Sequence, residues 1–257
     1  MKVHGWVAGA LLAFLGAVPA AQAADWDGVY VGLYAGPNHQ QGHATTTTVF
    51  SGAGYFASSS VTAIAATGSQ SYSASGATFG ALIGFNWSIG DRWVTGLEAD
   101  FGGNFDKDSV SSGAVYPCCA GTGFGIVSKA RTRWLFTARP RIGYLWMDDT
   151  LAYVTAGLAM TDLRSGFHFS DTFADANANG FFSDTRASWT AGGGIEKQID
   201  SDISVRLEYL YADFGSVSGT STNLTTEAFT IAWPANVFTH RQSLSEHMVR
   251  AAIMLHL

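Results

Sequence analysis

Charged residues recur at every second position inside several apolar stretches of this chain. Glu98 and Asp100 have this spacing, and so do Arg139 and Arg141. Successive side chains of a β-strand point to opposite faces, so charges two residues apart share one face. Arginines and carboxylates enclosed on facing strands would form ion pairs, and removing one partner of a buried pair costs about 3–5 kcal/mol. We predict an enclosed ion network made of Glu98, Asp100, Arg131, Arg133, Arg139, Arg141, Glu196, Arg206, Glu208 and Arg250.

Histidines are the remaining ligand candidates. His39 and His43 lie near the end of the first apolar stretch, and imidazole binds haem iron and divalent metals well. Histidines four residues apart would converge on one ligand only if they lay on a helix. We predict that the protein has no cofactor and no metal site. Haemin binding by these two histidines is kept as an alternative.

The two cysteines, Cys118 and Cys119, are adjacent in the sequence. They provide no disulfide framework for the fold. In an oxidising compartment they could form a vicinal bridge or pair with another molecule.

Motifs for enzymatic chemistry are missing or have a simpler explanation. The sequence contains no G-x-S-x-G nucleophile motif. Asp148 and Asp149 fall in a short turn, where Asp is favoured because it hydrogen-bonds the local backbone. Gly192–Gly194 interrupts a strand-like segment, with no following Lys-Ser/Thr and no helix, so it is not a phosphate-binding loop. We predict that the protein is not an enzyme.

The segments that carry the charges alternate apolar and polar residues, which is typical of β-strands. Ile203–Phe214 places isoleucine, valine, leucine and tyrosine on one face and Arg206 and Glu208 on the other. Glycines such as Gly80 and Gly84 share the charged face. Eight strands close around an interior just wide enough for side chains. Small and charged residues fit that interior and the bulky apolar face does not, so we predict an inside-out barrel with its charges in the lumen.

The connections between these segments differ in length from one end of the molecule to the other. Three short turns, at 89–92, 147–150 and 199–202, alternate with four longer connections, at 41–75, 106–128, 168–185 and 219–242. Outer-membrane barrels have short periplasmic turns and longer external loops. We therefore predict an all-β fold, an eight-stranded antiparallel up-and-down transmembrane β-barrel with long extracellular loops.

Composition agrees with a wall that faces lipid. Charged residues make up 13% of the 257 residues and aromatic residues 13%, with 30 glycines. A net charge of −6 offers no basic surface for nucleic acid. Aromatic residues near the strand ends predict interfacial girdles, with the members Tyr30, Trp87, Trp93, Tyr144, Trp146, Tyr153, Trp189, Tyr209 and Tyr211.

The first residues have the order of a secretory signal peptide. Lys2 precedes an apolar run from Val7 to Val18, and Ala21-Gln22-Ala23 supplies a small-residue cleavage site. The apolar run is too short for a membrane helix, which needs about 20 residues. We predict a signal peptide over residues 1–23, and a barrel domain over residues 24–257 that is exported to the outer membrane of a Gram-negative cell.

Four segments resemble a known family. They are DWDGVYVGLYAG at 25–36, WTAGGGIEKQID at 189–200, VRLEYLYADFG at 205–215 and HMVRAAIMLHL at 247–257. Together they resemble the Omp25/Omp31-like outer-membrane β-barrel proteins of alphaproteobacteria, which are porin-like outer-membrane immunogenic proteins. The resemblance implies an abundant, surface-exposed barrel associated with envelope integrity, and some members resemble haemin-binding proteins. Such proteins usually end in an aromatic residue that the assembly machinery recognises, whereas this chain ends in Leu257.

The function predicted from these observations is that of a non-enzymatic envelope structural and surface protein whose lumen is filled by ion pairs. Two alternatives remain open, a narrow porin for small solutes with an arginine-rich lumen and a haemin-binding surface protein. The expected partners are outer-membrane lipid and lipopolysaccharide, the outer-membrane assembly machinery, and host or surface molecules that contact the loops.

Overall fold

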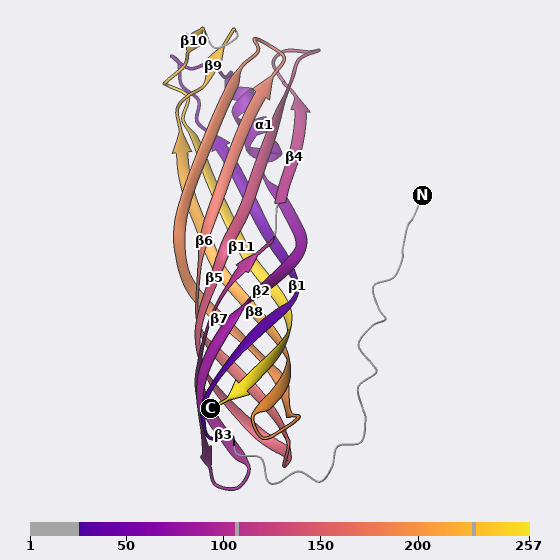
Figure 1. The fold of residues 1–257 in the computed structure, drawn as a ribbon. Helices are drawn as coiled ribbons and strands as arrows, with labels where there is room; N and C mark the ends of the chain where they lie inside the picture. Colours follow the sequence, from indigo (N-terminus) through magenta and orange to yellow (C-terminus); the bar gives the residue numbers. More distant parts are fainter. Residues whose placement is uncertain (1–25, 106–107, 228–229) are drawn as a thin grey trace, which may run out of the picture.

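The computed structural model describes residues 26–105, 108–227 and 230–257. The expected signal peptide lies outside the described residues. Long strands wind around a common axis to form a tall barrel (Figure 1). The elements are β1 (Gly28–Thr48), α1 (Ser58–Thr67), β2 (Gln70–Ile89), β3 (Trp93–Asn104), β4 (Asp108–Val115), β5 (Gly123–Met147), β6 (Thr150–Asp171), β7 (Asn177–Gln198), β8 (Ile203–Ser221), β9 (Thr225–Thr226), β10 (Ile231–Ala232) and β11 (Phe238–His256).

Eight of the strands form a closed ring. Neighbours pair antiparallel in the order β1, β2, β3, β5, β6, β7, β8 and β11, and β11 pairs with β1 again. The short strand β4 pairs with the upper part of β5, and β9 and β10 form a small hairpin at the same end. The predicted eight-stranded up-and-down topology is confirmed.

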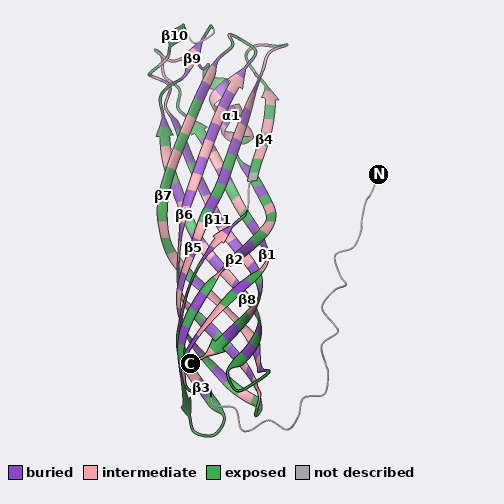
Figure 2. Ribbon diagram, in the orientation of Figure 1, coloured by how far each residue is buried: buried purple, intermediate pink, exposed green. Residues whose placement is uncertain are grey.

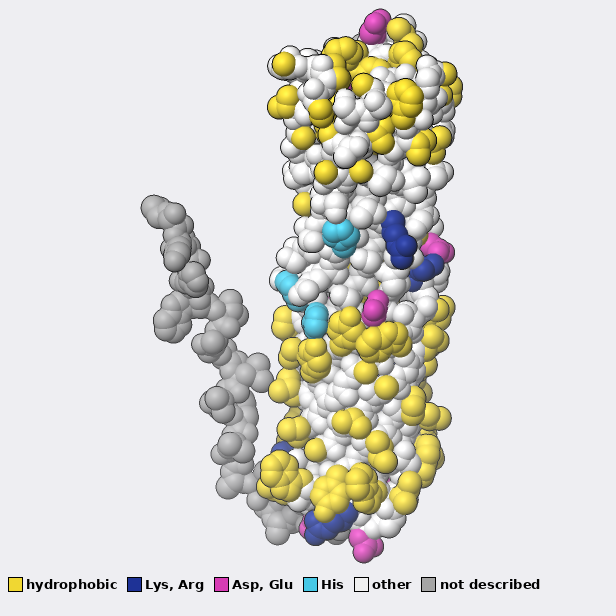
Figure 3. Space-filling view, turned by 180° about the vertical axis from the view of Figure 1, so that it is seen from behind, with side chains coloured by type: hydrophobic (Ala, Val, Ile, Leu, Met, Phe, Trp, Pro, Cys, Tyr) yellow, Lys and Arg dark blue, Asp and Glu magenta, His cyan; other side chains and the backbone are white. Residues whose placement is uncertain are grey.

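The alternation predicted from the sequence sets the direction of each side chain. On β8, Arg206 and Glu208 are 3% and 2% exposed, whereas Leu207 between them is 51% exposed. Buried and exposed residues alternate in the same way along the other strands (Figure 2). Apolar side chains are exposed on the lower half of the barrel, on the face that Figure 3 shows and on strands all around the ring. We call this the apolar belt, and its exposed members include Leu33, Ile83, Phe85, Leu97, Phe101, Val154, Leu158, Ile195, Leu207 and Ile253.

Strands continue well above the apolar belt, through much of the sequence predicted as long loops. The connection expected at 168–185 is strand up to Asp171 and again from Asn177. In the threonine run at the end of β1, Thr46 and Thr48 are buried while Thr47 faces outward. Many outward residues at this height are polar, such as Thr47, so the regular alternation of outward apolar and inward polar residues that identifies the lower strands is missing. The predicted strands therefore end several residues before the strands of the structure do.

The upper lumen contains its own apolar core. Helix α1 follows β1 and buries Ile64, although its serines and β-branched residues are weak helix formers. Burial in the barrel mouth therefore accounts for the helix. The cluster around it consists of Phe56, Ile64, Tyr116, Phe124, Ile126, Phe167, Phe169, Ala176, Ala178, Leu224 and Phe238. The described residues include no helix, α1 among them, with the length and hydropathy needed to cross a bilayer.

The wall is split between β7 and β8 above the apolar belt. These strands pair only up to Trp189 and Asp213. Beyond that point β8 turns away at Gly215, whose φ of +65° suits glycine. Arg186 reaches across the gap and donates from Nη2 to the carbonyl oxygen of Ser216, at 2.5 Å. Side chains therefore cover a stretch of wall in which β7 and β8 are not paired with each other.

Candidate functional site

The lower half of the lumen contains a compact cluster of charges. The structure brings together eight of the ten residues predicted for the ion network, and each is at most 5% exposed. Four are arginines and four are carboxylates, so the cluster is electrically balanced. Its members are Glu98, Asp100, Arg139, Arg141, Glu196, Arg206, Glu208 and Arg250.

Arg139 lies at the centre of the cluster. Its Nη2 donates to Glu98 Oε1 at 2.7 Å and to Asp100 Oδ2 at 2.9 Å. Its Nη1 donates to Glu208 Oε1 at 3.1 Å. Charge-assisted bonds of this kind are shorter and stronger than neutral ones. One guanidinium therefore joins carboxylates from two separate strands, β3 and β8.

One pair of the cluster crosses the full width of the lumen. Arg206 on β8 donates from Nη1 to Glu98 Oε2 on β3 at 2.6 Å. In the ring of eight strands, β3 and β8 are four places apart and therefore stand on opposite walls. Arg250 on β11 likewise reaches Asp100 at 3.1 Å and also pairs with Glu208. The walls of the barrel are thus joined by direct side-chain contacts at the height of these pairs.

Three tyrosines complete the cluster, and sequence reasoning misplaced two of them. Tyr30 and Tyr153 were predicted in the aromatic girdles, but both are buried in the lumen. Tyr30 donates its hydroxyl to Glu98 at 2.7 Å, and Tyr153 donates to Glu208 at 2.7 Å. Tyr34 donates to Asp100 at 3.3 Å. Each hydroxyl adds a second donor to a carboxylate oxygen that already accepts from an arginine.

Glycine on the neighbouring strand makes room for each of these rings. Tyr30 lies opposite Gly84, Tyr34 opposite Gly80, and Tyr153 opposite Gly194. A Cβ atom on Gly84 would lie 2.2 Å from the Tyr30 ring. A glycine opposite an aromatic residue indicates that the ring points into the lumen. Recognising such a pair requires the strand register, which the sequence alone does not give.

Arg131 and Arg133 do not join the network, and their predicted placement in the lumen is wrong. Both are exposed on the outer face of β5. The pairing of β5 with β6 is irregular between Thr132 and Leu135. A bulge inserts one extra residue and so reverses which residues of a strand face inward. Odd-numbered residues below the bulge, such as Arg139, face the lumen, whereas Arg131 and Arg133 above it face outward.

A second polar layer, missed by the sequence analysis, lies above the ion network. Glu246 on β11 is fully buried. It accepts hydrogen bonds from Asn38 Nδ2 at 2.6 Å and from Asn104 Nδ2 at 3.1 Å. Gln40 Nε2 donates to Thr132 Oγ1 at 2.8 Å in the same layer. Extending the alternation of Arg250 upward along the last strand would have found Glu246.

His39 and His43 point away from the lumen, on the outer face of β1. His39 Nδ1 lies 2.9 Å from Ser75 Oγ. The two ring nitrogens of His43 lie 3.1 Å from Ser71 Oγ and 3.2 Å from Ser69 Oγ. Residues four apart on a strand are separated by about 13 Å. In the structure each of these imidazoles contacts serine hydroxyls of β2 or of the connection before it.

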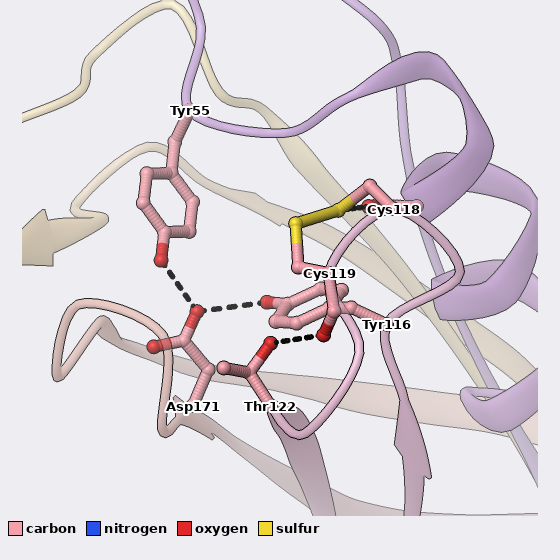
Figure 4. Close-up of a disulfide and its surroundings, with 7 residues drawn as sticks. Tyr55, Tyr116, Cys118, Cys119, Thr122 and Asp171 are labelled. Carbon is pink, nitrogen blue, oxygen red and sulfur yellow. Dashed lines mark hydrogen bonds between the residues drawn. A yellow bond between two sulfur atoms is a disulfide. The ribbon is translucent and has the colours of Figure 1, made fainter.

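The extracellular end contains a disulfide and a shared carboxylate (Figure 4). Cys118 and Cys119 form a vicinal disulfide, one of the two outcomes left open by the sequence. Asp171 Oδ2 accepts hydrogen bonds from Tyr55 at 2.6 Å and Tyr116 at 2.8 Å. Burial and the Asp171 carboxylate raise the pKa of both tyrosines, which therefore remain hydrogen-bond donors. These contacts hold three extracellular connections together.

The sequence is similar to those of named outer-membrane proteins. A model of the outer membrane protein beta-barrel domain family matches residues 8–232. The 31 kDa outer-membrane immunogenic protein of Brucella melitensis is 36% identical over 151 residues, which cover 58% of this chain and 58% of that protein. The 22 kDa outer membrane protein of Rhizobium leguminosarum bv. viciae is 33% identical over 135 residues, which cover 52% of this chain and 51% of that protein. The chain thus spans little more than half the length of these relatives.

A solved structure with a related shape is that of the outer membrane protein OprG from Pseudomonas aeruginosa. The two share 8% sequence identity, and the match covers 92% of this chain and 99% of that chain with a TM-score of 0.43.

Proposed function

Since this chain belongs to the outer membrane protein β-barrel domain family, we propose that it is a non-enzymatic structural and surface protein of the outer membrane, with a lumen closed by ion pairs. The buried carboxylates support the non-enzymatic role. Each of Glu98, Asp100, Glu196 and Glu208 is bonded to arginine and enclosed, which leaves none of them free to act on a substrate.

The observation that carries the proposal is the bond between Arg206 and Glu98. It joins opposite walls at 2.6 Å. A diffusion pore needs a continuous aqueous path, and this contact stands across that path. Above it, the Glu246 layer and the apolar cluster around α1 fill the lumen with buried side chains. A barrel closed at several heights is suited to bracing the envelope and presenting its outer end.

Conductance across a planar bilayer tests the closed lumen. Refolded full-length chain should produce no stable channels, with a general-diffusion porin as the positive control. Regular conductance steps from the unaltered protein would contradict the proposal and favour the alternative of a narrow porin for small solutes. If such steps appear, Arg139→Ala and Arg141→Ala should alter their ion selectivity.

We further propose that lipopolysaccharide is a partner, bound through its phosphates. Lys129, Arg131 and Arg133 are exposed on β5 above the apolar belt. Arg131 lies directly opposite Arg164 on β6, and like charges directly opposite are destabilising. Asp162 neutralises one of these cations, through a 2.8 Å ion pair with Arg164. An anionic headgroup at this height would relieve the remaining repulsion.

Binding to lipopolysaccharide, to dephosphorylated lipopolysaccharide and to inorganic phosphate separates the sources of the phosphate. The double variant Arg131→Ala/Arg164→Ala should bind intact lipopolysaccharide more weakly, and dephosphorylation should weaken binding to the unaltered protein in the same way. Equal binding by the variant would contradict the proposal. Full competition by millimolar inorganic phosphate would show a site for the free ion instead.

A further inference from the structure

Two histidines face each other across neighbouring strands on the outer wall. His39 on β1 is the direct register partner of His247 on β11. Their chain neighbours Asn38, Glu246 and Met248 are buried in the lumen, so both imidazoles lie on the outer face, where each is partly exposed. Directly opposite residues of antiparallel strands have Cβ atoms about 4.5–5.5 Å apart. Two imidazoles at this separation can reach one metal ion, which binds histidine nitrogen at about 2.0–2.1 Å.

The hydrogen bonds of both rings orient them for this role. His39 Nδ1 lies 2.9 Å from Ser75 Oγ, and His247 Nδ1 lies 2.8 Å from the Tyr209 hydroxyl. When Nδ1 carries the proton, it donates to these oxygens and Nε2 is left as the coordinating nitrogen. Metal-binding histidines almost always donate their other ring N–H to such a partner, which fixes the ring and its tautomer. The same arrangement occurs here on both sides of the pair.

His43 is excluded from the pair by its own contacts. It shares the outer face of β1 with His39, but both of its nitrogens are held by serines of β2 and the preceding connection. Within the described part of the chain, no group of three or more His, Cys, Asp or Glu side chains could hold a metal. A site at His39 and His247 therefore has two protein ligands, with its remaining positions open to water or to groups of the outer leaflet.

We propose that His39 and His247 form a two-histidine binding site for a divalent transition-metal ion. Imidazole suits Zn²⁺, Ni²⁺ and Cu²⁺, whereas Mg²⁺ and Ca²⁺ prefer oxygen ligands. Cu²⁺ binds most tightly of these ions in the general order of divalent affinities. Histidine side chains lie in the polar band directly above the apolar belt (Figure 3), where an ion can arrive from water. The site goes beyond the structural role proposed above and does not depend on whether the lumen conducts.

Titration of the refolded full chain in detergent with Cu²⁺, Zn²⁺ and Mg²⁺ tests the site. We expect one tight equivalent of Cu²⁺, weaker Zn²⁺ and no saturable Mg²⁺. The electron paramagnetic resonance spectrum of the Cu²⁺ complex should show two nitrogen ligands. His39→Ala and His247→Ala should each abolish the tight equivalent, and Tyr209→Phe should weaken it about tenfold by removing the orienting hydroxyl.

His43→Ala is the matched control, because it removes a histidine from the same face of the same strand. It should leave the affinity for Cu²⁺ unchanged. Equal weakening by His43→Ala and His39→Ala would overturn the proposal, and so would tight binding that survives loss of His39 and His247 together. Heat-modifiable gel migration establishes that each variant is folded. Where an alanine variant is not folded, His39→Gln, His247→Gln or His43→Gln replaces it at the same position.

Discussion

Replacing Arg139 by alanine should destabilise the barrel more than any change of a surface arginine. The guanidinium is fully enclosed and bonds Glu98, Asp100 and Glu208. Without it, three arginines remain for four carboxylates in the network. Removing one partner of a buried ion pair costs about 3–5 kcal/mol, because the surviving charge is buried and uncompensated. This corresponds to a change of roughly two to three and a half orders of magnitude in the unfolding equilibrium.

Urea unfolding of the refolded protein, followed by tryptophan fluorescence, measures this loss. With a slope of about 2 kcal/mol per molar urea, a loss of about 4 kcal/mol lowers the midpoint by about 2 M. Arg131→Ala provides a matched control on the same strand, because Arg131 is exposed. Exposed substitutions usually change stability by no more than about 0.5 kcal/mol. Similar midpoints for Arg139→Ala and Arg131→Ala would refute the reasoning.

A second variant separates lost contacts from surplus charge. Asp100→Asn in the Arg139→Ala background removes the extra negative charge. Residues of one ion network couple by about 0.5–3 kcal/mol, so the double variant should be less destabilised than the sum of the two single variants. Strict additivity would mean that Arg139 contributes packing alone.

Three further predictions concern other parts of the barrel. Gly84→Ala places a Cβ 2.2 Å from the Tyr30 ring and should cost about 1–3 kcal/mol in urea unfolding, whereas Gly52→Ala, with no atom near the added Cβ, should cost little. Burial lowers the pKa of His240, on the part of β11 above the apolar belt, from 6.5 to about 4. The unfolded chain therefore gains a proton below pH 6.5 that the folded chain does not, so stability should fall as the pH drops from 6.5 toward 4, and His240→Gln should remove that part of the fall. Reducing the Cys118–Cys119 bridge should barely move the urea midpoint, because stabilisation by a disulfide grows with the loop it closes and this one joins adjacent residues.

The lower half of the barrel was predictable because lipid outside and a narrow lumen inside impose strict alternation. That constraint placed Arg206 and Glu208 correctly from their spacing alone. It failed at Arg131 because a single bulge, invisible in the sequence, reversed the parity of everything above it on β5. It also failed for Tyr30, since a tyrosine near a strand end suits a girdle equally well. Only the register with Gly84 shows that its ring points inward.

Above the apolar belt the alternation of apolar and polar residues no longer identifies the strands. Water lies outside the wall there, so outward serine and threonine no longer contrast with inward polar residues such as Thr46. Helix α1 had no sequence signal because its stability comes from burying Ile64 in a cluster built from several strands and connections. Both features depend on contacts between distant segments, which composition and periodicity do not report.

The ion pair across the lumen is likewise a property of the whole ring. The sequence identifies Arg206 and Glu98 as inward-facing, but they are separated by 108 residues and face each other only because eight strands place β3 opposite β8. A wider ring with the same alternation would move the opposite walls apart and turn the same charges into the lining of a pore. Strand number therefore decides between plug and pore, and the direct contact across this ring favours the plug.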